Sequence, residues 1–378
     1  MIKLKNLLTE ASEIMENLPP GFDMNDFETV EEFTGQSLME ADEKFLGATT
    51  TDLPDSEMSG RFQQVADKTA NAVDKFKYPF IHRSNIIDDS GKPIDPNVLK
   101  KMIKERPKTI LSQNKKMMKS GKEAKFYDLS LPAFKGLIVD EATNEFKIVN
   151  TCPGAGACRV YCYAKKGGYV QWKASSLSQT RVLNFLLNDW QGFKSKVLSE
   201  ISSYSSGGKK KLVIRWHDSG DFLSQKYLQL AYDIAKETPN VTHYAYTKMV
   251  GMVSSSQKPD NFVFNYSQGA IAPEEKLINT KIHKHSVVVP KPMFIEFMHK
   301  DDESGKWIFN SDDDLKTFKN KMSMKYSIPL ESVITYDELM AKPEESNRTD
   351  KWNVIVPVGS GDDAAKRTDV LGTYLLIH

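Results

Sequence analysis

Residues 152–164 read Cys152-Pro-Gly-Ala-Gly-Ala-Cys158-Arg-Val-Tyr-Cys162-Tyr-Ala164, and this short stretch holds all three cysteines of the 378-residue chain. A predicted strand over 146–150 leads into it, and helical periodicity begins about ten residues after it. Pro153, Gly154 and Gly156 forbid regular structure here and let the backbone pass close to a neighbouring group. A glycine-rich cysteine loop between a strand and a helix indicates a site for a metal ion or cluster.

The three thiols alone leave the identity of the metal open. Structural zinc needs four ligands, usually as paired short Cys/His spacings, and this loop has neither a Cys-x-x-Cys pair nor a nearby His. Iron–sulfur clusters are held by thiolates, and three thiolates on four irons would leave one iron open to another molecule. Three plain thiols, two of them able to form a disulfide, are a third interpretation, which fits poorly with an N-terminus that lacks a signal peptide. We favour the cluster.

Charge is unevenly distributed along the chain. The net charge is +1, but residues 1–60 carry fourteen acidic and three basic side chains, a local charge of −11, which leaves +12 on the remainder. An acidic tail beside a basic body is common in proteins that meet nucleic acid. No apolar run approaches the length of a membrane span, and the N-terminus lacks a secretory signal, so we expect a cytoplasmic protein with no membrane partner.

Periodicity divides the chain into three predicted regions: an acidic, mobile tail over 1–60, a helical region over 61–133, and an α/β region over 134–378. The helical region contains a helix over 61–76 and a second helix capped by Asp95 and closed before Pro107.

From residue 146 onward, predicted strands alternate with helices, which is typical of parallel β/α units. About six strands are too few for a closed eight-fold barrel and favour a partial, open β/α barrel with an insertion at about 291–352. The predicted strands are 146–150, 212–216, 241–247, 262–266, 286–289 and 353–358. The predicted helices are 175–188, 193–203, 225–237 and 273–284, with two more in the insertion near 313–326 and 332–339.

Polar residues follow the predicted strands. In β/α barrels the chemistry lies at the carboxyl ends of the strands, so we expect these residues to converge on a site. The segments are Arg215-Trp-His-Asp-Ser-Gly-Asp221, Tyr246-Thr-Lys248, Asn265-Tyr-Ser-Gln-Gly269 and Gly359-Ser-Gly-Asp-Asp363. In the last of them, Gly359 and Gly361 could let adenine or a phosphate approach the backbone.

The segment after the second strand carries the richest chemistry. Strand alternation places Trp216 on one face, and Arg215 and His217, our candidate catalytic residues, on the other. His217, Asp218 and Asp221 could bind a metal, act in acid–base chemistry, or hold the ammonium and carboxylate of an amino acid. Alternatively, the aspartate caps the next helix and 219–221 is only its turn.

Two resemblances follow from these motifs. The cysteine loop, with Tyr161 just before the last cysteine, resembles that of the radical S-adenosylmethionine (SAM) superfamily. More narrowly, the chain from about Tyr127 onward resembles the gene product eighty-eight type of phage proteins. The matching segments are Asn150-Thr-Cys-Pro-Gly-Ala-Gly-Ala-Cys, Arg215-Trp-His-Asp-Ser-Gly-Asp-Phe, Tyr244-Ala-Tyr-Thr-Lys and Leu371-Gly-Thr-Tyr-Leu-Leu-Ile-His.

The superfamily resemblance implies a [4Fe–4S] cluster on the three cysteines, with SAM bound to its open iron, and an electron donor. It also implies that the loop of Asp218, Ser219, Gly220 and Asp221 contacts the ammonium of SAM, and that Asn265 and Ser267 contact its ribose. SAM would then be cleaved to methionine and a radical that abstracts hydrogen from a substrate.

We therefore predict a phage-encoded iron–sulfur, SAM-dependent enzyme of the host cytoplasm, whose substrate is unknown but plausibly a nucleotide or nucleic acid. One alternative is a zinc-containing module that binds nucleic acid. The other is a metal-dependent hydrolase or nuclease that uses His217, Asp218 and Asp221.

Overall fold

The computed structural model describes residues 43–67, 81–113, 124–162, 164, 172–206, 210–302, 307–357 and 362–376. Several predictions lie outside these residues: the first 42 residues of the acidic tail, the helix over 61–76 beyond residue 67, and Gly359 and Gly361. Residues 41–378 form one compact unit by their internal contacts.

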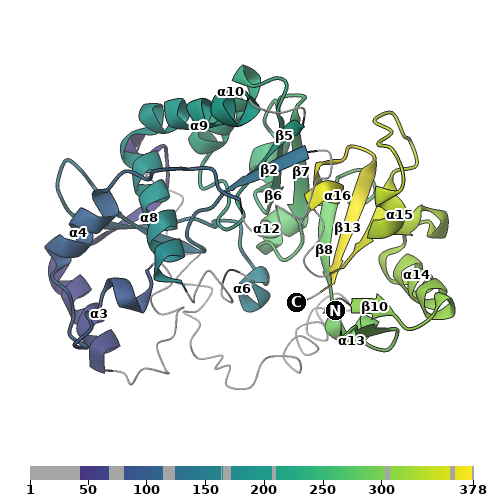
Figure 1. Ribbon diagram of the computed structural model, residues 1–378, viewed down its shortest axis with the longest axis horizontal. Helices are drawn as coiled ribbons and strands as arrows, with labels where there is room; N and C mark the ends of the chain where they lie inside the picture. Colours follow the sequence, from purple (N-terminus) through teal and green to yellow (C-terminus); the bar gives the residue numbers. More distant parts are fainter. Residues whose placement is uncertain are drawn as a thin grey trace. The chain divides into compact units, whose positions relative to one another are not determined.

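A sheet of eight parallel strands forms the centre of this unit (Figure 1). No pairing joins its two edge strands in the described chain, so the sheet is open. In spatial order the strands are β11 (Val333–Thr335), β12 (Trp352–Val356), β13 (Val370–Leu376), β8 (His285–Val289), β7 (Phe262–Ser267), β6 (Thr242–Thr247), β5 (Lys211–Trp216) and β2 (Ala124–Leu129).

The predicted α/β class and open parallel sheet are confirmed, but the number and identity of the strands are corrected. Strands β2, β5, β6, β7 and β8 follow one another in the sequence and are neighbours in the sheet. The chain then crosses to the opposite edge, where β11 and β12 lie, and β13 pairs between β12 and β8. Three of these strands, β2, β11 and β13, were not predicted. The predicted first strand, β4 (Phe146–Asn150), is not in this sheet at all.

One face of the sheet packs against long amphipathic helices, α8 (Lys173–Asn188), α9 (Trp190–Ser205) and α10 (Gln225–Glu237). Leu212, Ile214 and Trp216 of β5 point into this core, as strand alternation predicts. Helix α10 has the predicted bounds, and the Ser224 hydroxyl caps it by accepting a hydrogen bond from the Tyr227 backbone N–H.

The opposite face is covered by the short helix α16 (Asp362–Lys366), which contacts β6, β7 and β13. A smaller apolar cluster lies here, formed by Phe126, Val213, Tyr244 and Ala365. Lys284 fixes the carboxyl end of α16, because its buried ammonium donates to the carbonyl oxygens of Ala364, Arg367 and Val370.

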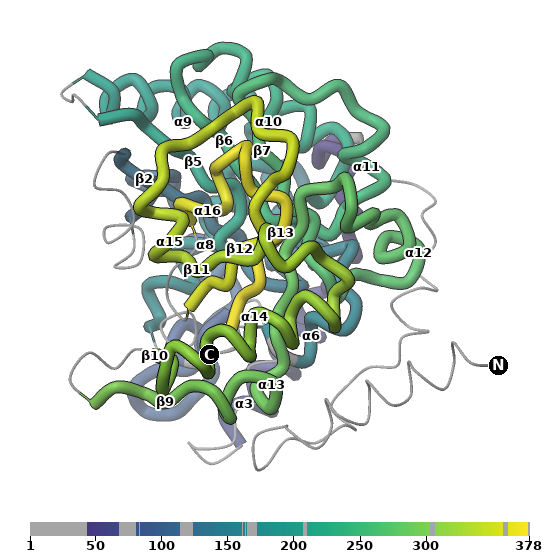
Figure 2. The backbone as a smooth tube through the Cα atoms, turned by 90° about the vertical axis from the view of Figure 1, so that its right-hand side faces the viewer, coloured from purple at the N-terminus to yellow at the C-terminus, as the bar shows by residue number. Residues whose placement is uncertain are grey.

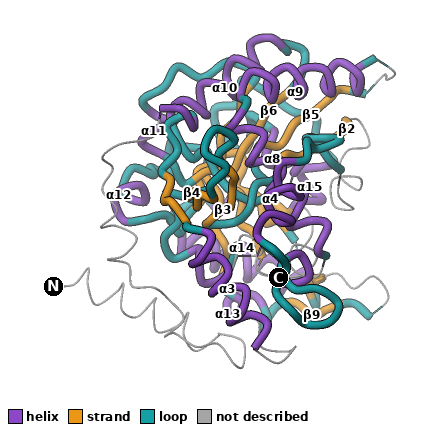
Figure 3. The backbone as a smooth tube through the Cα atoms, turned by 90° about the vertical axis from the view of Figure 1, so that its left-hand side faces the viewer, coloured by secondary structure: helices purple, strands orange, loops and turns teal. Residues whose placement is uncertain are grey.

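A second, antiparallel sheet has the order β1-β4-β3, with β1 (Thr50–Leu53) and β3 (Lys135–Val139) on either side of β4. It packs with α3 (Asp55–Asp67) and α4 (Pro96–Lys104) around a core of its own (Figure 3). Asp95 caps α4 as predicted, since its carboxylate accepts from the Asn97 N–H at 2.6 Å. The short helices η2 (Glu43–Phe45) and η3 (Arg83–Asn85) both contact α8.

The predicted mobile tail over 1–60 is therefore too long. Residues 43–60 contain a 3₁₀ helix, a paired strand and the start of α3, and Phe45, Leu53 and Met58 are buried. Acidic composition misled the prediction, because here the charges face solvent while the apolar side chains between them pack inward.

The insertion between β8 and β11 lies at one end of the parallel sheet (Figure 2). The helix predicted near 313–326 is confirmed as α14, whereas part of the region predicted as helix 332–339 is strand β11. The elements are α13 (Lys291–Phe294), β9 (Met298–Lys300), β10 (Trp307–Phe309), α14 (Asp312–Tyr326), η5 (Leu330–Ser332) and, after β11, α15 (Tyr336–Met340).

The remaining short helices lie in the connections at the carboxyl edge of the sheet: α6 (Cys158–Tyr161), α11 (Val250–Ser254) and α12 (Ala272–Glu275). The helix predicted over 273–284 is wrong beyond residue 275. Local bonds around Asn279 replace the helical pattern there: its backbone N–H donates to the His283 ring and its side chain accepts from the Lys281 N–H.

Candidate functional site

The cysteine loop lies against the carboxyl ends of neighbouring strands of the parallel sheet. After β5, the Asp221 N–H donates to the Thr151 carbonyl oxygen at 2.8 Å. After β7, the Gly269 carbonyl oxygen accepts from the N–H groups of Gly156 (3.1 Å) and Cys158 (3.0 Å). The backbone of the loop is thus fixed where the sequence predicts a site.

Two glycines make this close approach possible. A Cβ on Gly156 would lie 2.2 Å from the Ala270 carbonyl oxygen, and a Cβ on Gly154 would lie 2.7 Å from the Lys248 carbonyl oxygen. Both obstacles are backbone atoms of the segments after β7 and β6. The prediction that these glycines let the backbone pass close to a neighbouring group is confirmed.

The three thiols are half-buried and form no disulfide. Burial raises the pKa of Cys152 above its ordinary value, and the charges of Asp221, Cys162 and Cys158 raise it further, against a hydrogen bond from the Phe134 N–H at 3.3 Å. Each of these ionisable groups therefore lies within electrostatic range of Cys152.

Cys158 has a cationic neighbour. Burial raises the pKa of the Cys158 thiol, and the Lys248 ammonium opposes that shift. In the described ranges, no three His, Cys, Asp or Glu side chains converge at metal-binding distance. The loop supplies three soft sulfur donors close together, and such donors suit iron–sulfur or zinc chemistry. In the described residues these donors do not converge to the distances of a metal site.

Arg215 and His217 do not share a face of the sheet, contrary to the prediction. Arg215 points toward α16, where its guanidinium contacts Asp362 (3.1 Å) and Asp218 (3.2 Å). His217 instead points toward α10, where its Nε2 makes a 2.8 Å hydrogen bond with the Tyr227 hydroxyl. Strand alternation ends at Trp216, because His217 has the left-handed backbone angle φ 62°.

His217 occupies an aromatic enclosure formed by Trp216, Phe222 and Tyr227. Burial, followed by the Arg215 charge, lowers the pKa of His217 to about 3, so the imidazole is neutral near pH 7. Its Nδ1 is buried and has no hydrogen-bond partner among the described residues. Its surroundings are those of a packed core histidine.

Asp221 ties the β5 loop to the end of β6. Its carboxylate accepts from the Thr247 hydroxyl (2.7 Å) and the Lys248 N–H (2.8 Å), and also from the N–H of Phe222 (2.8 Å). Burial raises the pKa of Asp221, and these hydrogen bonds oppose the shift. The carboxylate is therefore already engaged by the protein.

Asp218 belongs to a buried cluster of charged groups with Asp128, Arg215 and Asp362, all at most 7% exposed. Asp128 ends β2 and hydrogen-bonds to the Asp218 carboxyl. Asp362 accepts from the Tyr244 hydroxyl at 2.7 Å. Sequence reasoning did not select Asp128 or Asp362; the Gly359–Asp363 segment pointed toward Asp362, whereas Asp128 lies in a strand that was not predicted.

His217, Asp218 and Asp221 are not brought together as a metal site. Each faces a different partner: Tyr227, Arg215, and the end of β6, respectively. The geometry proposed for a hydrolase built on these three residues is therefore absent from the described structure.

The remaining predicted site residues differ in their surroundings. Asn265 Nδ2 donates to the carbonyl oxygens of Ala245 and Ala365, and the Ser267 hydroxyl bonds to that of Ser286 at 2.9 Å. Ser219 Oγ is buried and lacks a partner within the described ranges, and Gly220 adopts φ 89°. Tyr161 ends α6, and its side chain is not described.

Fold and site together define an α/β protein with an open parallel sheet and a three-cysteine loop fixed at the carboxyl edge of that sheet. The chain belongs to the gene product 88 family, whose family model matches residues 108–332. That range includes the cysteine loop and strands β2 and β5 to β8.

No curated protein and no solved structure matches the chain. Among the described helices, none is both long enough and apolar enough to cross a membrane.

Proposed function

We propose that this protein is an iron–sulfur enzyme in which Cys152, Cys158 and Cys162 hold a [4Fe–4S] cluster, and that it acts with SAM on a nucleotide or nucleic acid. The observation that carries the proposal is the placement of three thiols on a loop fixed across strand ends. Ligand sites in open α/β sheets lie outside the carboxyl ends of the strands.

The electrostatics of the loop support a cationic centre. Negative charge on Cys158, Cys162 or Asp221 disfavours ionisation of Cys152. A bound metal centre would reverse this effect, because thiolates that ligate a metal are deprotonated by it.

When bound, such a cluster would supply one electron, delivered by a donor protein, to the reductive cleavage of SAM. The chain's own part is to present the thiols, exclude water and orient SAM. The backbone of the loop presents the thiols, since Gly154 and Gly156 let it lie against the segments that follow β6 and β7.

The contacts to SAM need one change from the sequence prediction. Asp221 is fully engaged and Asp218 faces Arg215, so neither is placed to hold an ammonium group. We instead place the amino acid end of SAM against Ser219 and Gly220, because the buried Ser219 hydroxyl has no partner in the described chain.

We also propose that the sheet is the partial, open β/α barrel expected from the sequence. The short helix α16 contacts both β6 and β13, although β7 and β8 lie between them. Three strand spacings amount to about 14 Å in a flat sheet. Curvature of the sheet around α16 would bring the outer strands within reach of so short a helix.

A zinc-containing module that binds nucleic acid is the second candidate, favoured by the +12 charge outside the acidic segment. Structural zinc needs a fourth ligand, and Asp221, an acidic neighbour of Cys152, already accepts hydrogen bonds from the protein. In either case we expect the protein to work in the cytoplasm of a phage host.

The test is anaerobic purification of the full chain, reconstitution with iron and sulfide, and measurement of bound metal. We expect about four irons per chain, and a change in the paramagnetic resonance spectrum of the reduced protein when SAM is added. Stoichiometric zinc without sulfide, unaffected by SAM, would refute the cluster and establish the second candidate.

Variants locate the centre. Cys152→Ala, Cys158→Ala and Cys162→Ala should each abolish iron binding, because two thiolates do not retain the cluster. Ser219→Ala should keep the iron but weaken the response to SAM. It serves as the control that separates loss of the centre from loss of the ligand. Full iron content in any cysteine variant would contradict the assignment of that thiol.

A further inference from the structure

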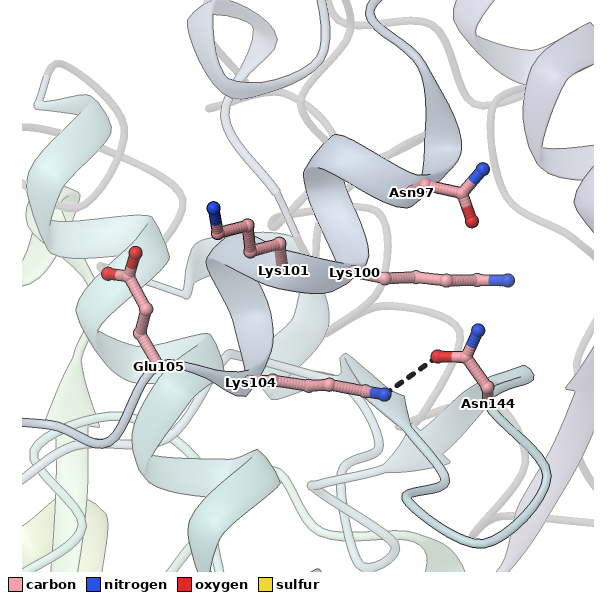
Figure 4. A pocket seen from close by; sticks show the side chains of 6 residues that line it. All are labelled: Asn97, Lys100, Lys101, Lys104, Glu105 and Asn144. Carbon is pink, nitrogen blue, oxygen red and sulfur yellow. Dashed lines mark hydrogen bonds between the residues drawn. The ribbon is translucent and has the colours of Figure 1, made fainter.

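A pocket of about 450 Å³ lies beside helix α4 (Figure 4). It is lined by Asn97, Lys100, Lys101, Lys104, Glu105 and Asn144. All but the last come from α4 or the residue that follows it. Asn144 comes from the turn between β3 and β4, so the two walls belong to different parts of the chain.

Helical spacing brings Lys100 and Lys104 to one side of α4. Residues 97, 100 and 104 are successively three and four positions apart and share a surface, while Leu99 and Ile103 are fully buried in the core. In Figure 4 the side chains of Asn97, Lys100 and Lys104 extend to one side of α4, and Asn144 faces Lys104 from the opposite wall, whereas Lys101 extends the other way from the helix.

The charges of the pocket do not cancel. Lys100 is only 6% exposed; its ammonium pairs with Asp55 at 2.7 Å and lies 5.0 Å from the centroid of the Phe146 ring. Glu105 pairs with Arg181. Within the described residues, Lys101 and Lys104 form no ion pair; Lys104 donates only to the neutral Asn144 Oδ1, at 2.7 Å.

The turn that carries Asn144 is fixed in place. Asn144 has the left-handed angle φ 58°, and its backbone N–H donates to the Asp140 carbonyl oxygen at 2.8 Å. Because its Oδ1 accepts from Lys104, its amide NH₂ remains as a further donor on the pocket wall. The amide of Asn97 can supply another donor across the pocket.

Lysines in the last turn of a helix also compensate the helix dipole. That effect accounts for Lys101 and Lys104 as charges. It does not account for a pocket around them, or for the two asparagine amides that line it. Ammonium and amide donors around a hollow with surplus positive charge are the chemistry that recognises a phosphate group.

We propose that this pocket binds a phosphate group, from either a nucleotide or a nucleic acid backbone. Its volume is of the size that accommodates small ligands. Helix α4 belongs to the core formed with the antiparallel sheet, and none of the pocket residues lies in the cysteine loop. The site therefore does not depend on the proposed function, and a chain without a cluster should keep it.

The test is isothermal titration calorimetry of the full chain with pyrophosphate, ATP and a short single-stranded oligonucleotide. We expect saturable binding with a Kd below about 1 mM, weakened about tenfold or more by Lys104→Met. Lys316→Met is the matched control, because it removes an exposed lysine from another helix, α14, and so changes the net charge equally.

The three probes distinguish the source of the phosphate. Tighter binding of ATP than of the oligonucleotide would indicate a nucleotide site. Much tighter oligonucleotide binding that falls steeply with salt would indicate a nucleic acid backbone. Absence of saturable binding to all three probes would overturn the proposal, and so would an equal loss in the two lysine variants. Thermal melting would verify that Lys104→Met is folded.

Discussion

Asp128 should make the stability of this protein depend on pH in an unusual direction. It is 2% exposed at the carboxyl end of β2 and accepts from the Ser112 hydroxyl at 3.0 Å. Burial, and then the charge of Asp218, raise the pKa of Asp128 to about 7, while Arg215 and Ser112 oppose the shift. Asp128 therefore holds a proton below neutral pH.

The sign follows from proton counting. Between about pH 4 and pH 7, the folded protein binds a proton at Asp128 that the unfolded chain does not. Stability from this group is fully present below pH 4 and is lost as the pH rises through 7. A shift of three units corresponds to about 4 kcal/mol, of which roughly 2.5 kcal/mol falls between about pH 5 and pH 8.

Asp128→Asn tests this pH dependence of stability. The amide has the shape of a protonated carboxyl and can donate to Asp218 at every pH. We expect the variant to match the wild type near pH 5, and to be more stable by about 2 kcal/mol or more near pH 8. Urea denaturation followed by tryptophan fluorescence at several pH values measures the difference directly.

Comparison of the two proteins removes the contribution of all other titrating groups. Asp260→Asn, which changes an exposed aspartate, is the control and should shift the profile little. If Asp128→Asn has the same pH slope as the wild type, or is the less stable protein near pH 8, then Asp128 is not protonated in the folded protein near neutral pH.

Three other substitutions or truncations give independent tests. Gly156→Ala should cost about 1–3 kcal/mol of unfolding free energy, because the new methyl group meets a carbonyl oxygen; a variant as stable as the wild type in urea denaturation would show that the loop does not approach Ala270 so closely. Tyr227→Phe should cost about 1 kcal/mol by removing the only described partner of His217 Nε2, and unchanged urea denaturation would contradict that. Removing residues 1–60 should lower the melting temperature well below that of a chain lacking only 1–40, because strand β1 and the start of α3 would be lost. Equal melting temperatures would show that residues 41–60 do not stabilise the fold, as the predicted tail over 1–60 requires.

Local features were readable from the sequence because their causes are local. Asp95 and Pro96 fix the start of α4, and hydrophobic periodicity gives α10 its observed bounds. The three cysteines and the glycines between them identified the loop, because only glycine tolerates so close a neighbouring backbone. None of these inferences needed knowledge of a distant segment.

Sheet membership was decided by the tertiary structure. The strand 146–150 has the same alternating pattern as its parallel counterparts, yet it pairs with β1 and β3. Periodicity defines which face of a strand is apolar, but not which edge it pairs with. For the same reason β2, a short strand next to a lysine-rich segment, went unpredicted although it supplies Asp128.

The class of the fold and the cysteine loop near the strand ends can be inferred from residue order alone. The contacts of the polar residues there depend on segments that are far apart in the sequence. Asp128, Asp218 and Asp362 meet around Arg215 because three separate segments end at one edge of the sheet. His217 turns away from that cluster because a single left-handed residue reverses the direction that strand alternation assigns to its side chain.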